Sequence, residues 1–216
     1  MEDAPRAVEA ASKEGGLDDV LVLGTRNLKK LRELEELLAG AAPRLAALAD
    51  FPDAPIPAET GATFLENATL KAATLSKALG RWVLGEDSGL CVDALGGRPG
   101  VYSARYAGEP TDDERNNDKL LFEMRDVPDE MRSARYVCAA VVCDPRGEVR
   151  AESHGVCEGR ITRARRGAGG FGYDPLFLIV SEGRTFGESP PAIKRRLSHR
   201  AEAIRKLRPL IMDLSS

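Results

Sequence analysis

The chain has 216 residues, of which 43% are hydrophobic and 30% are charged, and its formal net charge is −3. These values fit one globular domain with a real core, and they exclude the bulk positive field of a nucleic-acid-binding protein. No apolar run of about 18 residues occurs, so no transmembrane helix is predicted and a membrane is not an expected partner.

The N-terminal segment and the cysteines indicate the extent of the domain and the compartment in which the protein is expected. Residues 1–18, rich in Ala, Glu and Asp, are expected to be a disordered extension of a single domain formed by residues 19–216. The cysteines show no Cys-x-x-Cys spacing, and most lie in apolar or strand-like runs. Buried reduced thiols, and hence a cytoplasmic location, are therefore predicted instead of disulfides or zinc. The cysteines are Cys91, Cys138, Cys143 and Cys157.

The first predicted elements are a strand and a helix. The apolar, valine-containing run Val20–Leu23 predicts a buried strand, and the leucine stripe that follows predicts a helix with Asn27 as its N-cap and Gly40 as its C-cap. Thr25, Asn27 and Lys30 thus lie beside helix N–H groups, which outlines an anion site. A plain N-cap with solvated lysines is the alternative, because the spacing is not that of a P-loop.

A second helix follows an Ala/Pro-rich segment, residues 41–58, which predicts a linking strand and loop. Thr63 and Glu66 form a capping-box pattern, so the helix is expected to begin there and to end at Gly80. Glu66 is therefore interpreted as a structural cap and not as a metal ligand.

Two adjacent carboxylates occur in the stretch Glu86-Asp87-Ser88-Gly89-Leu90, where a short strand is expected to end. Ligands in open α/β sheets bind outside the carboxyl ends of strands, and paired carboxylates there suit Mg²⁺. Glu59, in the loop before the second helix, can also face a metal, and Lys71 is either a solvated lysine or a phosphate ligand. An ordinary polar turn is the alternative, because Asp-Ser-Gly is common turn composition.

The middle third begins with a loop and a helix. Three glycines and a proline mark residues 96–106 as a shaped loop without regular structure. Thr111 and Glu114 form a second capping-box pattern, which predicts a helix that ends at about Met124.

An antiparallel meander is expected next. The alternating segment Ser133–Cys143 predicts a long strand, and Asp144–Gly147 predicts a hairpin turn. Two further strands are expected at residues 149–153 and 155–162.

The glycine-rich stretch Gly167–Pro175 matches Gly-x-Gly-x-x-Gly by its letters. A dinucleotide-binding fingerprint is disfavoured, because the strand-like run Leu176–Val180 follows where a helix should begin. Glycines around Phe171 would leave its ring free to stack on a base, as aromatic side chains do in nucleic-acid-binding proteins. A core phenylalanine in a tight loop is the alternative.

The basic segment Ile193–Arg200 is expected to open the last helix, with Ser198 as its N-cap. His199 falls in the first turn, where the helix dipole disfavours a positive charge, so a neutral hydrogen-bonding histidine is predicted. A run of charge of this kind usually marks a solvated face.

The polar motifs follow one another in a fixed order: Thr25-x-Asn27-x-x-Lys30, Glu59-Thr60-Gly61, Glu66-Asn67-Ala68-x-x-Lys71-Ala72, Glu86-Asp87-Ser88-Gly89-Leu90, Gly96-Gly97-x-Pro99-Gly100-x-Tyr102-Ser103-Ala104-Arg105-Tyr106, Gly169-Gly170-Phe171-Gly172-Tyr173-Asp174-Pro175 and Ser198-His199-Arg200. In order and spacing, over about residues 20 to 210, they resemble the inosine triphosphate pyrophosphatase family (Ham1-like). The resemblance implies an α/β fold with a long central mixed β-sheet flanked by helices, and two lobes with a nucleotide-binding cleft between them. It also implies a homodimer that uses Mg²⁺ to hydrolyse ITP, dITP and XTP to the nucleoside monophosphate and pyrophosphate.

The same resemblance implies a role for each motif. Asp87 would be the general base, and Glu59 and Asp87 would hold Mg²⁺, whereas a contact between Glu86 and the metal stays open. The residues expected to bind the triphosphate are Thr25, Arg26, Asn27, Leu28, Lys29, Lys30, Lys71 and Ser88. Those expected at the base and sugar end are Phe171, which would stack on the base, with Gly172, Tyr173, Asp174, Lys194, His199 and Arg200.

Arg26 and Arg200 carry two further expectations. Arg26 stands where the family usually has glycine, so either the loop differs or the guanidinium adds a phosphate contact. Arg200, placed opposite the purine 6-position, would donate a hydrogen bond to an oxo group, whereas an amino group there would face it with another donor, a buried mismatch that costs about 1–3 kcal/mol.

Other functions are weighed against this one. A Maf-like nucleotide pyrophosphatase usually has an N-terminal Ser-x-Ser-x-Arg-Arg pattern, and residues 25–30 do not match it. A nucleotide-binding sensor without turnover would keep Phe171 and the lysines but would need no acid at position 87. A dinucleotide-dependent oxidoreductase would depend on the weak glycine match at residues 167–172.

Overall fold

The computed structural model describes residues 20–40 and 43–214, so the expected disordered extension, residues 1–18, lies outside the described residues. The strands are β1 (Val20–Leu23), β2 (Arg44–Ala47), β3 (Trp82–Val92), β4 (Ser133–Cys143), β5 (Val149–Ile161), β6 (Phe177–Ile179) and β7 (Arg184–Thr185). The helices are α1 (Leu28–Leu38), α2 (Phe64–Leu79), α3 (Asp113–Glu123), α4 (Pro191–Leu197) and α5 (His199–Leu214).

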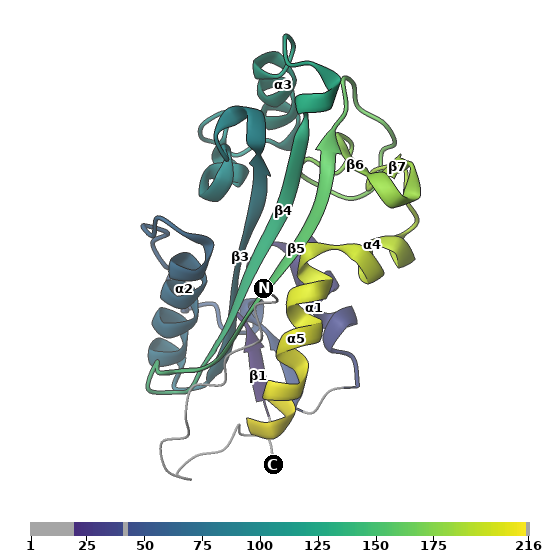
Figure 1. Ribbon diagram of the computed structural model, residues 1–216. Coiled ribbons are helices and arrows are strands. Elements are labelled where there is room, and N and C mark those ends of the chain that lie inside the picture. The colour runs from purple at the N-terminus through teal and green to yellow at the C-terminus, as the bar shows by residue number, and fades with distance from the viewer. Residues whose placement is uncertain (1–19, 41–42, 215–216) are drawn as a thin grey trace. The chain divides into compact units, whose positions relative to one another are not determined.

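One seven-stranded sheet carries the fold, in the order β2-β1-β3-β4-β5-β6-β7 (Figure 1). Strand β1 pairs in parallel with β2 and with β3, whereas β5 and β6, and β6 and β7, pair antiparallel. The predicted α/β class with a mixed sheet is therefore confirmed. Among the described residues, no helix has the length and apolarity that crossing a bilayer requires.

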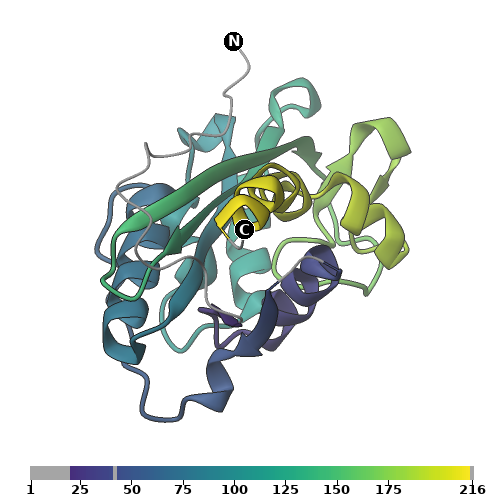
Figure 2. The same cartoon turned by 90° about the horizontal axis from the view of Figure 1, so that it is seen from below.

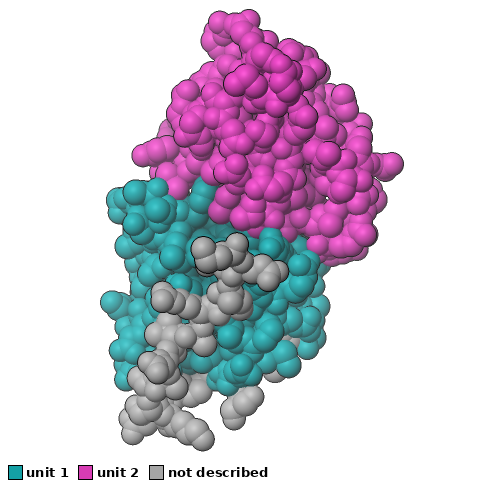
Figure 3. Space-filling view, viewed as in Figure 1, with its two compact units in different colours: residues 1–87, 138–155, 200–216 teal, residues 88–137, 156–199 magenta. Residues whose placement is uncertain are grey.

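The chain divides into two compact units, which Figure 3 shows in different colours. Unit 1 contains residues 1–87, 138–155 and 200–216, and unit 2 contains residues 88–137 and 156–199. Strands β3, β4 and β5 each contribute residues to both units.

In unit 1 the sheet is covered on both faces, α1 and α5 packing on one and α2 on the other (Figure 2). Because successive side chains of a strand point to opposite faces of the sheet, the buried side chains of each strand enter two different core clusters. Leu21, Leu23 and Leu84 pack in the cluster that contains α1 and α5, whereas Val22 and Val83 pack with residues of α2. The buried apolar strand predicted at residues 20–23 is confirmed by this burial on both faces.

Unit 2 has an aromatic core. Tyr136 of β4 lies 4.6 Å from Phe177 of β6, measured between ring centroids, and Phe177 lies 5.6 Å from Phe186. Leu120 and Met124, from α3 and its C-terminal end, belong to the same buried cluster. The helix that the second capping box predicts therefore closes this core.

Several predicted boundaries are confirmed by hydrogen bonds. Asn27 caps α1, and its side chain accepts from the backbone N–H groups of Lys29 and Lys30. Thr63 and Glu66 form the expected reciprocal capping box of α2. The hairpin turn after β4 closes where predicted, since the Gly147 N–H donates to the Asp144 carbonyl at 2.8 Å.

Some predicted boundaries are wrong. Strand β3 does not end at the acidic stretch but continues to Val92, because β1 and β4 flank it and tertiary pairing overrides turn composition. The N-cap of α3 is Asp112 and not Thr111, since the Asp112 carboxylate accepts from the Arg115 N–H at 2.9 Å.

Two further differences lie in the second half of the chain. The strands expected at residues 149–153 and 155–162 form one continuous strand, β5. The basic segment does not open the last helix, because it forms a separate helix, α4, and the extended backbone of Ser198 separates α4 from α5.

Candidate active site

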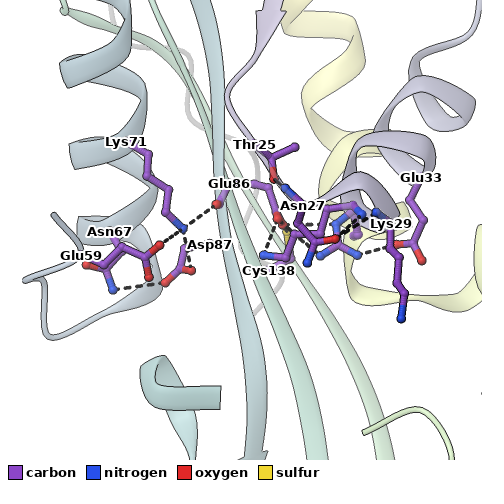
Figure 4. Close-up of polar contacts among 12 residues, drawn as sticks. Thr25, Asn27, Lys29, Glu33, Glu59, Asn67, Lys71, Glu86, Asp87 and Cys138 are labelled. Carbon is purple, nitrogen blue, oxygen red and sulfur yellow. Dashed lines mark hydrogen bonds and ion pairs between the residues drawn. The ribbon is translucent and has the colours of Figure 1, made fainter. Parts of the chain in front are cut away.

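Glu86 and Asp87 are neighbours on β3, and their side chains point to opposite faces of the sheet in unit 1 (Figure 4). This follows from strand geometry, in which successive side chains alternate between faces. Asp87 points to the side of α2, and Glu86 points to the side of α1. The adjacent carboxylates therefore enter two different polar groups.

The Asp87 group is built by α2 and the loop before it. Lys71 Nζ lies 3.1 Å from Asp87 Oδ1 and 2.9 Å from Glu59 Oε1. Asn67, one helical turn before Lys71, donates through Nδ2 to Asp87 Oδ2 at 3.2 Å. Its own Oδ1 accepts from the Gly61 N–H at 2.8 Å, so the loop that carries Glu59 is tied to the same helix. Glu59, Asn67, Lys71 and Asp87 thus form one connected group.

A close approach between α2 and β3 brings this group together. A Cβ atom added to Gly85 would lie 2.6 Å from the Ala68 carbonyl oxygen and 2.7 Å from the Ala72 nitrogen. Only glycine lets the strand backbone approach the helix this closely. Lys71 lies between these two alanines in sequence, and Asp87 lies two residues after Gly85. The contact at Gly85 therefore sets the distance from Lys71 to Asp87.

The electrostatics of the Asp87 group favour a basic carboxylate. Asp87 is 5% exposed, and burial raises its pKa although the charges of Lys71 and Lys30 oppose the change. Burial lowers the pKa of Lys71, but the charges of Asp87 and Glu59 outweigh it, and the net shift is upward. The arrangement thus has a cationic lysine beside a carboxylate that is more basic than a free one.

The Glu86 group is an ion-pair network on the other face. Glu86 Oε1 lies 2.7 Å from Lys30 Nζ, and Glu86 Oε2 lies 3.2 Å from Arg200 Nη2. The Arg200 guanidinium also binds the carboxylate of Glu33 on α1, and the Cys138 thiol lies 3.4 Å from Glu86 Oε2. Burial alone would raise the pKa of Glu86, but Arg200 and Lys30 together hold it well below its usual range. Glu86 therefore stays ionised, and its carboxylate is paired with Lys30 and Arg200.

The first loop approaches the same network from β1. The Asn27 side-chain oxygen accepts from the N–H groups of Lys29 and Lys30 at 2.9 and 3.2 Å, and the Thr25 hydroxyl oxygen accepts from the Asn27 N–H. Because the cap occupies these N–H groups, a phosphate at this end of α1 would depend chiefly on lysine side chains and the helix dipole. Leu28, the first residue of α1, is exposed.

Arg26 is accommodated in this loop without backbone strain. No non-glycine residue of the described segments has a positive φ, so the loop does not require a glycine conformation at this position. The Arg26 guanidinium donates to the Ala54 carbonyl oxygen at 2.8 Å. This contact ties the loop to the segment after β2, within unit 1.

The other predicted residues form a second group, in unit 2, around the carboxylate of Asp174. Asp174 is buried, and its Oδ2 accepts from the Phe171 N–H at 2.8 Å and from Lys194 Nζ at 2.6 Å. The ammonium of Lys194 also lies 4.0 Å from the centroid of the Phe171 ring, a cation–π distance. Gly170 is required beside this carboxylate, because a Cβ there would lie 2.0 Å from Asp174 Oδ2.

Tyr136 extends the Asp174 group to His199. The Tyr136 hydroxyl lies 3.4 Å from Asp174 Oδ1, and its ring stacks on the His199 imidazole with centroids 4.7 Å apart. Burial and the nearby Asp174 charge raise the pKa of Tyr136 well above its ordinary value, so the hydroxyl stays protonated and can donate. Tyr173 is buried and donates to the Ser103 carbonyl oxygen, which is a packing role.

The predicted residues fall into separate groups, around Asp87 and Glu86 in unit 1 and around Asp174 in unit 2, and two of them are separated from their expected partners. Glu59 and Asp87 share Lys71, but Glu86 is directed away from them. Arg200, expected at the base end, is 1% exposed and is held by Glu86 and Glu33 in unit 1. Ser88, next to Asp87 on β3, is half-buried.

Sequence reasoning missed three residues in these groups. Asn67 could have been found from its i, i+4 spacing with Lys71, and Glu33 from its i, i+3 spacing with Lys30, since such pairs share a helix face. Tyr136 gave only a core signal, as one of the alternating residues of β4. Its link to Asp174 needs tertiary structure.

The donor set for a metal is small. Within residues 20–40 and 43–214, no group of three or more His, Cys, Asp or Glu side chains is placed to hold an ion. Mg²⁺ is commonly held by only one or two carboxylates together with substrate phosphates. Glu59 and Asp87, both within 3.1 Å of Lys71 Nζ, meet that smaller requirement. The residues therefore fit a Mg²⁺ ion that is bound together with a phosphate ligand.

Known proteins resemble this chain over most of its length. A dITP/XTP pyrophosphatase of Rhodopirellula baltica is 52% identical over 194 residues, which cover 90% of this chain and 93% of that protein. One of Geobacillus kaustophilus is 52% identical over 187 residues, which cover 87% and 91%. A solved HAM1 protein from Coxiella burnetii superposes with a TM-score of 0.82 at 37% identity, covering 90% of this chain and 98% of that one. The model of the Ham1 family matches residues 21–210, and the chain belongs to this family.

Proposed function

We propose that this protein hydrolyses deaminated purine nucleoside triphosphates, dITP, XTP and ITP, to the nucleoside monophosphate and pyrophosphate. Such an activity removes aberrant purines from the nucleotide pool. The observation that carries the proposal is the buried Asp87 carboxylate, held between Asn67 and Lys71 beside Glu59. Relatives at 52% identity that are named dITP/XTP pyrophosphatases support the choice of substrate.

Asp87 is proposed as the general base. Cleavage between the α and β phosphates needs a water molecule in line with the α phosphorus and a carboxylate that orients it and accepts its proton. The raised pKa of Asp87 makes it a better proton acceptor than a solvated aspartate. Asn67 and Lys71 bind one oxygen each, which fixes the rotation of the carboxylate.

The lysines are proposed to neutralise charge on the triphosphate, and the carboxylates are proposed to hold the metal ion. Lys71 and Lys30 lie on opposite faces of β3 and would neutralise phosphate oxygens, with Thr25, Asn27 and Lys29 nearby. Glu59 and Asp87 are the residues that would hold Mg²⁺. The bound ion would neutralise negative charge on the leaving pyrophosphate. Glu86 has no proposed part in holding it, because two cations already engage its carboxylate.

The Asp174 group of unit 2 is proposed as the base-binding part. Phe171 offers a ring face for stacking, with Lys194 and Asp174 fixed beside it. Stacking of a base on an aromatic ring contributes about 1–3 kcal/mol where it has been measured by alanine substitution. Tyr136 supplies a further polar atom next to Asp174, and His199 stacks on the Tyr136 ring.

Release of pyrophosphate tests the proposal directly. The purified protein is assayed with dITP, XTP, ITP, ATP and GTP, with Mg²⁺ and with EDTA. We expect turnover of the first three substrates, much less of ATP and GTP, and loss of activity with EDTA. Turnover mainly of other nucleotides would favour a Maf-like pyrophosphatase, and binding without turnover would favour a nucleotide sensor. Activity that persists in EDTA would overturn the proposed Mg²⁺ requirement.

A homodimer and a cytoplasmic location stay predictions, the first from the family resemblance and the second from cysteine usage. The mass of the protein in solution, measured by light scattering, tests the first. A monomeric mass at the concentration used for catalysis would contradict it.

A further inference from the structure

Gly172, the residue after Phe171, forms hydrogen bonds through both its N–H and its carbonyl oxygen with side chains of one helix in unit 2. Its N–H donates to Asp113 Oδ2 at 2.8 Å, and its carbonyl oxygen accepts from Asn117 Nδ2 at 2.9 Å. Asp113 and Asn117 are four residues apart on α3, so they project from the same helix face. One face of α3 therefore fixes the glycine.

The N–H before Gly172 is fixed as well. The Phe171 N–H donates to Asp174 Oδ2, the oxygen that also receives Lys194. The backbone on both sides of the Phe171 side chain is thus held, by Asp174 before it and by α3 after it. Gly172 has a φ of +59°, a conformation that few residues other than glycine adopt. Because glycine adopts positive and negative φ about equally well, the orientation of this peptide is fixed by its hydrogen bonds and not by an intrinsic backbone preference.

The hydrogen bonding of the buried Asn117 side chain is not what a residue that only stabilises the fold would show. It is 1% exposed, and its Oδ1 has no hydrogen-bond partner among the described residues. A buried acceptor without a partner costs free energy, which an apolar side chain of similar size would avoid. The adjacent Asn116 differs, since its side chain accepts from the Ala107 N–H and donates to the Ala104 carbonyl oxygen. Within the described part of the chain, the side-chain hydrogen bond from Asn117 to Gly172 is what the asparagine adds over a leucine.

We propose that Asp113 and Asn117 are positioning residues for base binding. By fixing the Gly172 peptide they hold the Phe171 ring in the orientation in which it stacks on the purine. This inference rests on the proposed function, in which Phe171 contacts the base. In this role the residues act through Gly172 and need no contact with the phosphates or the hydrolytic water.

Substitutions at the two positions separate this role from a structural one. Asn117→Leu removes the donor to Gly172, and Asp113→Ala removes the acceptor, whereas Asp113→Asn keeps an oxygen that can accept. We expect Asn117→Leu and Asp113→Ala each to raise KM for dITP about fivefold to tenfold, with kcat within about twofold of wild type. Asp113→Asn should recover most of the loss. Asn117→Leu should keep or raise Tm, because it removes the unpartnered oxygen.

A ligand without a base provides the second measurement. Inorganic tripolyphosphate carries the phosphates alone, so its inhibition constant should be the same in wild type and in all variants. Asp118→Ala is the matched control, since Asp118 follows Asn117 on α3 and its carboxylate binds Arg165 at 2.8 Å and not Gly172. Its KM for dITP should not change.

The possible failures can be told apart. If the wild-type protein turns over neither dITP nor XTP, the proposed function itself fails. If it does, and KM for dITP is unchanged in Asn117→Leu and Asp113→Ala, only the positioning role is overturned. A parallel loss of dITP affinity, tripolyphosphate inhibition and Tm would also overturn it, because that pattern indicates a general structural defect.

Discussion

Asp87 shows how the surroundings of a single side chain change its pKa. It lies between a lysine and an asparagine of α2, and burial raises its pKa. Asp87→Asn keeps the shape of the side chain but cannot accept a proton, so kcat with dITP should fall by about 10²-fold or more. The measurement is steady-state hydrolysis at saturating dITP. Asp93→Asn, at an exposed aspartate, is the control, and near wild-type turnover of Asp87→Asn would refute the role of general base.

Arg200 leads to a different prediction from the one that its motif suggests. Its guanidinium is buried between Glu86 and Glu33, so Arg200→Met would leave a buried carboxylate with one cation fewer. Breaking a buried pair from one side costs about 3–5 kcal/mol, and the free energy of unfolding should fall by that order. Urea unfolding measures this change, and kcat/KM for dITP and dATP measures discrimination.

The ratio of the two kcat/KM values should stay constant in Arg200→Met, because the guanidinium is committed to carboxylates. Arg196→Met, at an exposed arginine that pairs with Glu182, is the control and should change neither quantity. A variant of Arg200 that keeps its stability but loses preference for dITP over dATP would restore the base-reading role.

At the residue scale, the sequence did not show where the side chains of the acidic pair point. The resemblance implied that Glu86, Asp87 and Arg200 are site residues, which stays a prediction. It could not show that Glu86 and Asp87 face opposite sides, because that required knowing that β3 continues through them. The partners of Arg200, Glu86 and Glu33, lie 114 and 167 residues away in sequence, beyond the reach of local spacing.

At the scale of elements, the contact between α2 and β3 decides the geometry of the Asp87 group. Gly85→Ala would place a methyl group 2.6 Å from the Ala68 carbonyl oxygen, so helix and strand must separate. We expect a loss of about 1–3 kcal/mol in the free energy of unfolding, as for other overpacked sites, and a fall in kcat because Lys71 moves with the helix. Thermal unfolding and dITP turnover measure the two effects. Unchanged values for both would show that the contact is not tight.

Capping signals were the most reliable sequence information about elements. Asn27, Thr63 with Glu66, and Gly80 each act at the helix end where the pattern placed them, because a cap is a local hydrogen bond. The predicted end of β3 was wrong for the converse reason. Turn composition is a local preference, and pairing with two neighbouring strands overrides it.

At the scale of the whole molecule, the reactivity of the cysteine thiols measures the packing of both units. All four thiols are free, and three are buried. Burial raises the pKa of Cys138 well above its ordinary value and, with the Asp144 charge, raises that of Cys143 to about 12. Because the thiolate is the reactive form, iodoacetamide at about pH 8 should label the native protein little and slowly.

Denatured protein provides the reference for this labelling. Without reductant, all four thiols should react in guanidinium chloride, which tests the prediction of reduced cysteines. Rapid labelling of a thiol in the native protein would contradict the packing. Fewer than four reactive thiols in denaturant would contradict the reduced state.

The fold class was predictable because the motif series, from Thr25 to Arg200, covers most of the domain. Composition and periodicity alone reached only an α/β chain with a meander. The order of the sheet, with β1 between β2 and β3, depends on long-range pairing that no local pattern contains.

The alternation at Glu86 and Asp87 has a consequence for how this gene can change. Inserting one residue between Trp82 and Glu86 would place the longer glutamate carboxylate beside Lys71 and leave a glycine beside Arg200, whereas deleting one would place the shorter aspartate beside Arg200 and leave a serine beside Lys71. Both networks would fail together, although no acidic residue had been lost. Length variation should therefore be purged from this strand more strictly than substitution, and natural indels should accumulate in the loops outside it.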